Sequence, residues 1–288
     1  MRFLDVKTDY AFKKVFGSEE SKDILISLLN AAIDFGAEAQ ILDLTIVDPY
    51  QIPLLKGMKD TYVDVKALLS NQRRVIIEMQ VLNVDGFEKR VLYNAAKAYS
   101  TQLQKAELYS SLEPIIALTI TDFVMFPDIP PVLTYFHLLE KETLIRYNDD
   151  IELIFIELPK FTKTEAELTT IIDKWIYFIK HAGSLDMIPK ALDDLPLQKA
   201  FQIANTAGLS EEELEIQHKR RDFIWMQKGA LEKAARDGEK RGLEIGEEKG
   251  EKKAKIAIAR NMLEKSLDFQ TIAEITGLTI ADIQNIAQ

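Results

Sequence analysis

The chain has 288 residues, 47% of them hydrophobic, so it can bury at least one full core, and we expect one main globular domain with appendages. It contains no cysteine, which excludes disulfides and thiolate metal sites, and its three histidines are too scattered to indicate a zinc centre. The formal net charge of −10 argues against a general nucleic-acid binder, although local basic residues remain in the N-terminal half.

The sequence carries no recognisable targeting or membrane signal. Its opening, MRFLDVKTDY, lacks the apolar core of a signal peptide, and there is no run of about twenty apolar residues. Together with the absence of cysteine, these features predict a cytoplasmic protein without membrane contact.

Residues 8–35 predict two helical segments, the second over 21–33, whose main expected role is to cover a sheet. Thr8 or Asp9 can cap the first segment. Asp9 and Lys13 lie one helical turn apart, so both could face a metal ion or a phosphate group.

A first strand is predicted over 41–50, followed by a loop over 51–60 that could line a substrate channel. Polar and apolar residues then alternate on either side of a short polar turn, SNQR, which predicts a β-hairpin. Three polar groups, Tyr62, Asp64 and Lys66, share one parity in its first strand, and Glu78 and Gln80 share one parity in its second.

A turn centred near Gln72 would place Lys66 opposite Glu78 and Asp64 opposite Gln80, with the two carboxylates diagonal and about 7–8 Å apart at the backbone. Converging carboxylates repel unless a proton or a metal lies between them, and oxygen donors favour Mg²⁺ or Mn²⁺. Lys66 and Gln80 could then position a water or offset phosphate charge. The same alternation is also typical of a half-solvated antiparallel sheet, so both interpretations stay open.

Residues 87–109 predict a helix of about six turns directly after the hairpin. Its first-turn amides and Arg90 can point at a phosphate, whereas solvation at the surface is the expected role of Lys97 and Lys105. Three more strands are predicted over 114–120, 132–140 and 151–158, the first of them central and covered on both faces.

The remainder of the chain is predicted to be helical. Helices are expected over 164–182, near 186–193 and over 196–207, and a long charged helix follows over 210–264. Four glycines spaced by four residues in that helix favour either a semi-flexible arm or self-association: Gly238, Gly242, Gly246 and Gly250.

The last element has the spacing of a helix-turn-helix, with Ala273, Gly277 and Ile283 as its small, turn and core residues. Its second helix carries no lysine or arginine to meet phosphates, which favours protein contact over DNA reading.

One motif in this chain resembles a known family. Asp64, thirteen intervening residues and then Glu78-Met79-Gln80 resemble the D…ExQ variant of the D…(D/E)xK signature in the Rpn family of recombination-promoting nucleases, which are also labelled transposases. The opening KTDYAFKKVFG, the helix from residue 88 and the strand LEPIIALTITDF resemble family elements in the same order. Gln80 replaces the usual lysine, and Ala106 stands where the family has glycine.

The resemblance implies an α/β (α+β) fold with a restriction-endonuclease-like αβββαβ core and a C-terminal all-helical extension. We expect a core over 1–160, a helical subdomain packed on it over 161–209, the charged arm over 210–265 and a small helical hairpin over 266–288.

The implied activity is a Mg²⁺-dependent (or Mn²⁺-dependent) DNA endonuclease associated with DNA recombination or mobile-element defence. The expected metal ligands are Asp64 and Glu78, which act in catalysis with Gln80 and Lys66. The residues expected to contact DNA are Arg90, Lys13, Asp9 and Tyr93. The rival hypothesis is a degenerate nuclease fold that binds DNA or protein without cleavage, and the C-terminal helices could join copies of the chain.

Overall fold

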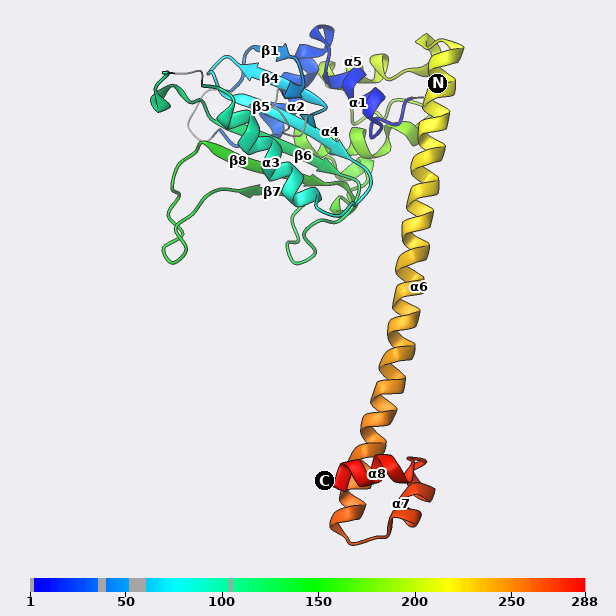
Figure 1. Cartoon of the computed structure of the whole chain (residues 1–288). Coiled ribbons are helices and arrows are strands. Elements are labelled where there is room, and N and C mark those ends of the chain that lie inside the picture. Colours follow the sequence, from blue (N-terminus) through cyan, green and yellow to red (C-terminus); the bar gives the residue numbers. More distant parts are fainter. Residues whose placement is uncertain (1–2, 36–39, 52–60, 104–105, 288) are drawn as a thin grey trace. The chain divides into compact units, whose positions relative to one another are not determined.

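The computed structural model describes residues 3–35, 40–51, 61–103 and 106–287 (Figure 1). The chain divides into two compact units, Met1–Ile224 and Trp225–Gln288. Within the described ranges, no helix combines the length and the apolar character that crossing a membrane requires.

The first unit is built on a mixed sheet whose strand order is β1-β4-β5-β6-β8-β7. β5, β6 and β8 run parallel to one another, and the other neighbours pair antiparallel. The strands are β1 (Leu44–Val47), β4 (Val65–Leu69), β5 (Arg74–Gln80), β6 (Ile115–Thr121), β7 (Leu133–Phe136) and β8 (Ile151–Glu157). A separate two-stranded ladder joins β2 (Tyr50–Gln51) to β3 (Thr61–Tyr62).

Helices cover both faces of this sheet. The first face packs against α1 (Asp9–Phe16), α2 (Lys22–Ala32), α4 (Ile171–His181) and α5 (Leu195–Ile203), and the second against α3 (Phe87–Ser100). Short 3₁₀ turns lie at Glu19–Ser21, Tyr109–Ser111, Leu158–Lys160, Glu165–Glu167, Ala182–Ser184 and Thr206–Gly208. Every residue of β6 is buried, as predicted for a central strand. The predicted α/β fold and its αβββαβ order are therefore confirmed.

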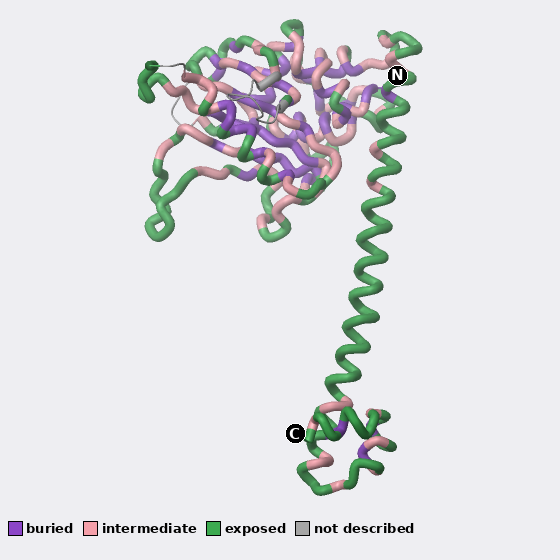
Figure 2. The backbone as a smooth tube through the Cα atoms, viewed as in Figure 1, coloured by how far each residue is buried: buried purple, intermediate pink, exposed green. Residues whose placement is uncertain are grey.

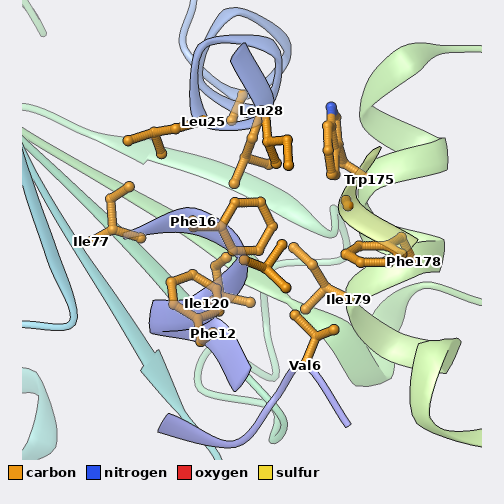
Figure 3. Packing of buried hydrophobic residues seen from close by; sticks show 14 of the residues in the cluster. Val6, Phe12, Phe16, Leu25, Leu28, Ile77, Ile120, Trp175, Phe178 and Ile179 are labelled. Atoms are coloured by element: carbon orange, nitrogen blue, oxygen red, sulfur yellow. The ribbon is translucent and has the colours of Figure 1, made fainter. Parts of the chain in front are cut away.

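The main core lies between the sheet and the first helical layer (Figure 3). Trp175 of α4 is fully buried there, with its ring centroid 5.8 Å from those of Phe16 and Phe178. Its indole Nε1 donates a hydrogen bond of 3.1 Å to the Ser27 hydroxyl. Helices α4 and α5 are therefore part of the same core as α1 and α2, and the aromatic residues of α4 pack rather than lie exposed.

The hairpin forms, but its predicted register is wrong by two residues. Lys66 pairs with Ile76 instead of Glu78, because the reversal is centred at Asn71, with Gln72 in the left-handed region at φ 68°. Val63 packs towards α3, whereas Val65 packs into the main core on the opposite face. Residues two apart on a regular strand would share a face, so the chain bends between them, at Asp64.

Two helical predictions also need correction. The helix predicted over 87–109 ends at Ser100, and Lys105 lies outside the described residues, as does most of the 51–60 loop. No helix forms over 186–193, where the chain is irregular around a turn at 190–191.

Ala106 occupies the position where glycine was expected, and its φ is 75°. A Cβ in the left-handed region costs about 1–2 kcal/mol, which glycine avoids. We expect Ala106→Gly to raise the free energy of unfolding by about 1 kcal/mol, measured from urea denaturation of the full chain. As a control, Ala96→Gly at an exposed position in α3 should lower it by about 1 kcal/mol. A loss of stability in both variants would contradict this account.

The continuous helix α6 (Glu211–Glu264) confirms the long predicted helix. Its first turns belong to the first unit, and beyond Ile224, in the second unit, it is mostly exposed (Figure 2). Apart from the nearby backbone of α6 itself, a Cβ added at any of its four regularly spaced glycines would meet no described atom within 4 Å. The last turns of α6 pack with α7 (Phe269–Thr276) and α8 (Ile280–Ala287) around buried Ala259, Ile272 and Ile283. Gly277, at φ 69°, ends α7 and makes the predicted turn.

Candidate functional site

Asp64 lies at the bend before β4, beside the C-terminal half of β5. Its backbone amide donates to the Ile77 carbonyl at 3.0 Å, and its Oδ2 accepts a 2.7 Å hydrogen bond from the Met79 amide. The side chain is only 13% exposed. The bend thus turns the Asp64 carboxylate towards the backbone of β5, at the residue that follows Glu78.

Helix α1 brings two further charged groups to Asp64. Its apolar residues, including Phe12 and Val15, are buried in the core, which leaves Asp9 and Lys13 on its other side. Lys13 Nζ is 2.7 Å from Asp9 Oδ1 and 3.5 Å from Asp64 Oδ1. The structure therefore places Asp9 and Lys13 beside the first candidate metal ligand, one helical turn apart as expected.

The pKa values of the two neighbouring carboxyls move in opposite directions. Burial, reinforced by the hydrogen bond and charge of Asp9, raises the pKa of Asp64 to about 7 against the opposing effects of the Met79 amide and Lys13. Burial also acts to raise the pKa of Asp9, but hydrogen bonds with Lys13, Asp64 and Arg220 outweigh it and lower the value to about 2. The pair therefore shares one proton over a wide range of pH.

This raised pKa of Asp64 predicts a pH dependence of stability in the absence of divalent metal. Above the unfolded-state value of 3.8, the folded chain holds a proton that the unfolded chain has lost, so stability falls as pH rises towards about 7. Asp64→Asn should remove this slope, which is on the order of 1 kcal/mol per pH unit. Thermal unfolding of both proteins at several pH values between 4 and 7 measures it, and parallel profiles would refute it.

Glu78 and Gln80 project from β5 towards α3, where Arg90 contacts both. Arg90 Nη2 donates to Glu78 Oε1 and, at 2.7 Å, to Gln80 Oε1. Asn94 Nδ2 lies 3.5 Å from Glu78 Oε2. Burial raises the pKa of Glu78, whose side chain is 15% exposed, while the charge of Arg90 opposes that shift. Arg90, expected to contact a DNA phosphate, is thus held by two other site residues.

Two predicted site residues make their contacts elsewhere. Lys66 of β4 is partly buried, and burial followed by the charge of Arg74 lowers its pKa. Tyr93 lies on the more exposed side of α3, with its ring centroid 6.0 Å from Lys97 Nζ. The expectation that Lys97 is solvated is wrong, because it is only 3% exposed.

Two residues near the site were missed from the sequence. Asn94 follows Arg90 by four residues on the same helix face, so the spacing could have revealed it. Arg220 lies far along the chain at the start of α6, and its Nη1 is 3.0 Å from Asp9 Oδ2. Only the fold brings Arg220 to the site.

The candidate ligands are oxygen donors, the type that a hard divalent cation prefers. In the described part of the chain, no three histidine, cysteine, aspartate or glutamate residues gather closely enough to hold a metal. Mg²⁺ needs fewer such ligands, since it usually keeps several waters and takes one or two carboxylates. Asp64 and Glu78 offer the carboxylates and Gln80 an amide oxygen, and Arg90 contacts one oxygen each of Glu78 and Gln80.

Comparison with protein families defines the class of protein. The model described as PD-(D/E)XK nuclease family transposase matches residues 6–234, most of the chain. A second model, described as the C-terminal HTH domain of the Rpn/YhgA-like nuclease family, matches residues 252–288. The chain therefore belongs to the PD-(D/E)XK nuclease family transposases, and the predicted Rpn-family resemblance is confirmed. No curated protein and no solved structure matches it.

Proposed function

We propose that this chain is a divalent-metal-dependent DNA endonuclease in which Asp64 and Glu78 hold Mg²⁺ or Mn²⁺. Family membership supports a nuclease. The main structural support for the site is the buried Asp64 carboxylate, which accepts a hydrogen bond from the amide of Met79, the residue after Glu78. Burial raises the pKa of Asp64 to about 7. A cation bound to ionised Asp64 would offset the repulsion between Asp64 and Asp9, as the shared proton does in the metal-free chain.

A metal bound here would acidify a water and polarise the phosphodiester. Three other residues would then act on the phosphate and the attacking water. Lys13, 3.5 Å from Asp64 Oδ1, would offset charge on the phosphate, the role first expected of Lys66. Gln80 would orient the attacking water through its amide, as the usual lysine of the signature would. Arg90, beside Glu78 and Gln80, would contact the DNA phosphate through its planar guanidinium.

DNA is the proposed partner, and the helix-turn-helix family match supports it. A role in recombination or mobile-element defence is part of the proposal, as are a cytoplasmic location and self-association through the C-terminal helices. The absence of lysine and arginine from α8 still favours protein contact for that helix.

Incubation of the purified full chain with supercoiled plasmid tests the activity directly. Nicked or linear DNA should form with Mg²⁺ or Mn²⁺, and chelation with EDTA should stop its formation. The rival function, DNA or protein binding without cleavage, is favoured by the ion pair between Glu78 and Arg90. Plasmid that stays uncut with either metal would refute the endonuclease and leave the binding module.

A further inference from the structure

The first turns of α6 contact α1 through residues on one helix face. Tyr10 donates its hydroxyl to Glu213 Oε1 at 2.5 Å, and Thr8 donates to Gln217 Oε1 at 3.3 Å. Arg220, seven residues after Glu213, pairs with Asp9 at 3.0 Å. Spacings of four and seven put these α6 side chains on a common face, so this part of the helix packs along α1.

A continuous series of charged contacts runs from α6 to the candidate catalytic carboxylate. Arg220 contacts Asp9 Oδ2, Lys13 contacts Asp9 Oδ1, and Lys13 also approaches Asp64 Oδ1. Asp9 is thus held from two sides by cations that come from different helices. Asp9 also shares a hydrogen bond with Asp64, so it is the residue through which Arg220 and Lys13 are linked to that carboxylate.

The Arg220–Asp9 ion pair is too exposed to contribute much to the stability of the fold. The two side chains are 46% and 47% exposed, and exposed ion pairs typically contribute only about 0.2–1 kcal/mol. The contacts of Glu213 and Gln217 with α1 would still hold α6 in place if Arg220 were removed. A variant of Arg220 should therefore fold.

We propose that Arg220 is a positioning residue of the nuclease site, which holds Asp9 and through it Lys13 in the arrangement that faces Asp64. The first turns of α6 then take part in the nuclease site, although they belong to the long charged helix. This inference rests on the proposed endonuclease activity for its catalytic consequence, but the positioning of α1 can be measured without any cleavage.

The test compares Arg220→Ala and Arg220→Lys with Arg221→Ala in the full chain. Arg221 is the matched control, because it is the next residue of α6 and its nearest described carboxylate is that of Asp222, at 4.0 Å. Hydrogen exchange of residues 8–16 reports the order of α1 independently of activity. Plasmid cleavage at varied DNA concentration separates kcat from KM.

In Arg220→Ala we expect faster exchange in α1, with an unchanged melting temperature, and a loss of kcat of about tenfold or more at constant KM for DNA. Arg220→Lys should restore most of the activity, because it keeps the charge beside Asp9, and Arg221→Ala should behave as the unmodified chain. In an Asp9→Asn background, Arg220→Ala should cause little further loss, since both changes break the same contact.

Unchanged α1 exchange in Arg220→Ala, or equal effects in Arg221→Ala, would overturn the inference. So would a full tenfold loss in the Asp9→Asn background, because Arg220 would then act by another route. If the unmodified chain leaves DNA uncut, the proposed function fails, and the exchange measurement alone decides whether Arg220 holds Asp9.

Discussion

Asp64→Asn is expected to lower Mg²⁺-dependent plasmid cleavage by more than about 100-fold while the protein stays folded. Loss of residues that merely support metal ligands costs about 10–100-fold, so loss of a ligand should cost more. Asparagine keeps the size of the side chain and its acceptor for the Met79 amide, but it removes the charge that would bind the cation. Initial rates over a range of Mg²⁺ concentrations measure the effect.

Asp43→Asn is the matched control for this variant. Asp43 is exposed, lies just before β1, and accepts a hydrogen bond from the Leu44 amide, which asparagine can also accept. The Asp43→Asn variant loses the same charge at a position outside the site. Its cleavage rate should therefore stay within about twofold of that of the unmodified chain. Equal rates for Asp64→Asn and the unmodified chain would remove Asp64 from the proposed site.

Trp175→Ala is expected to destabilise the first unit by about 3–5 kcal/mol, the cost typical of emptying a large aromatic site in a core. The indole is fully buried between Phe16 and Phe178, and its loss also leaves the Ser27 hydroxyl without this donor (Figure 3). Because Phe16 belongs to α1, the cavity would also loosen the helix that carries Asp9 and Lys13. Urea denaturation followed by circular dichroism measures the loss.

The second tryptophan provides the control. Trp225 lies on α6 and is 77% exposed, so Trp225→Ala should change stability by no more than about 0.5 kcal/mol. A small loss from Trp175→Ala, similar to that of Trp225→Ala, would show that α4 does not share the core of α1.

The order of the elements could be predicted from the sequence because each of them has a clear local period. The alternation around Asp64 and Glu78 predicts the hairpin, and the continuous apolar run from Ile115 predicts the buried central strand. The hairpin register could not be predicted, because it depends on the left-handed conformation of Gln72, a residue type with no special preference for it.

The candidate site was only partly predictable for a related reason. The family signature identified Asp64, Glu78 and Gln80, and helix spacing paired Asp9 with Lys13. Tertiary packing causes the break in alternation at Asp64 and brings Arg220 to Asp9. The local periodicity of the sequence contains no information about either. Lys97 was expected at the surface because lysine is rarely buried, yet the position of α3 against the sheet covers it.

The four regularly spaced glycines make the middle of α6 less stable than its two ends. They lie between Gly238 and Gly250 with open space around each, so no packing offsets a helix-forming cost of roughly 4 kcal/mol relative to four alanines. Transient opening should therefore begin in this segment, well before either end of the helix unravels. Such a weak segment would let the first turns of α6, which contact α1, and its last turns, which pack with α7 and α8, melt independently of each other.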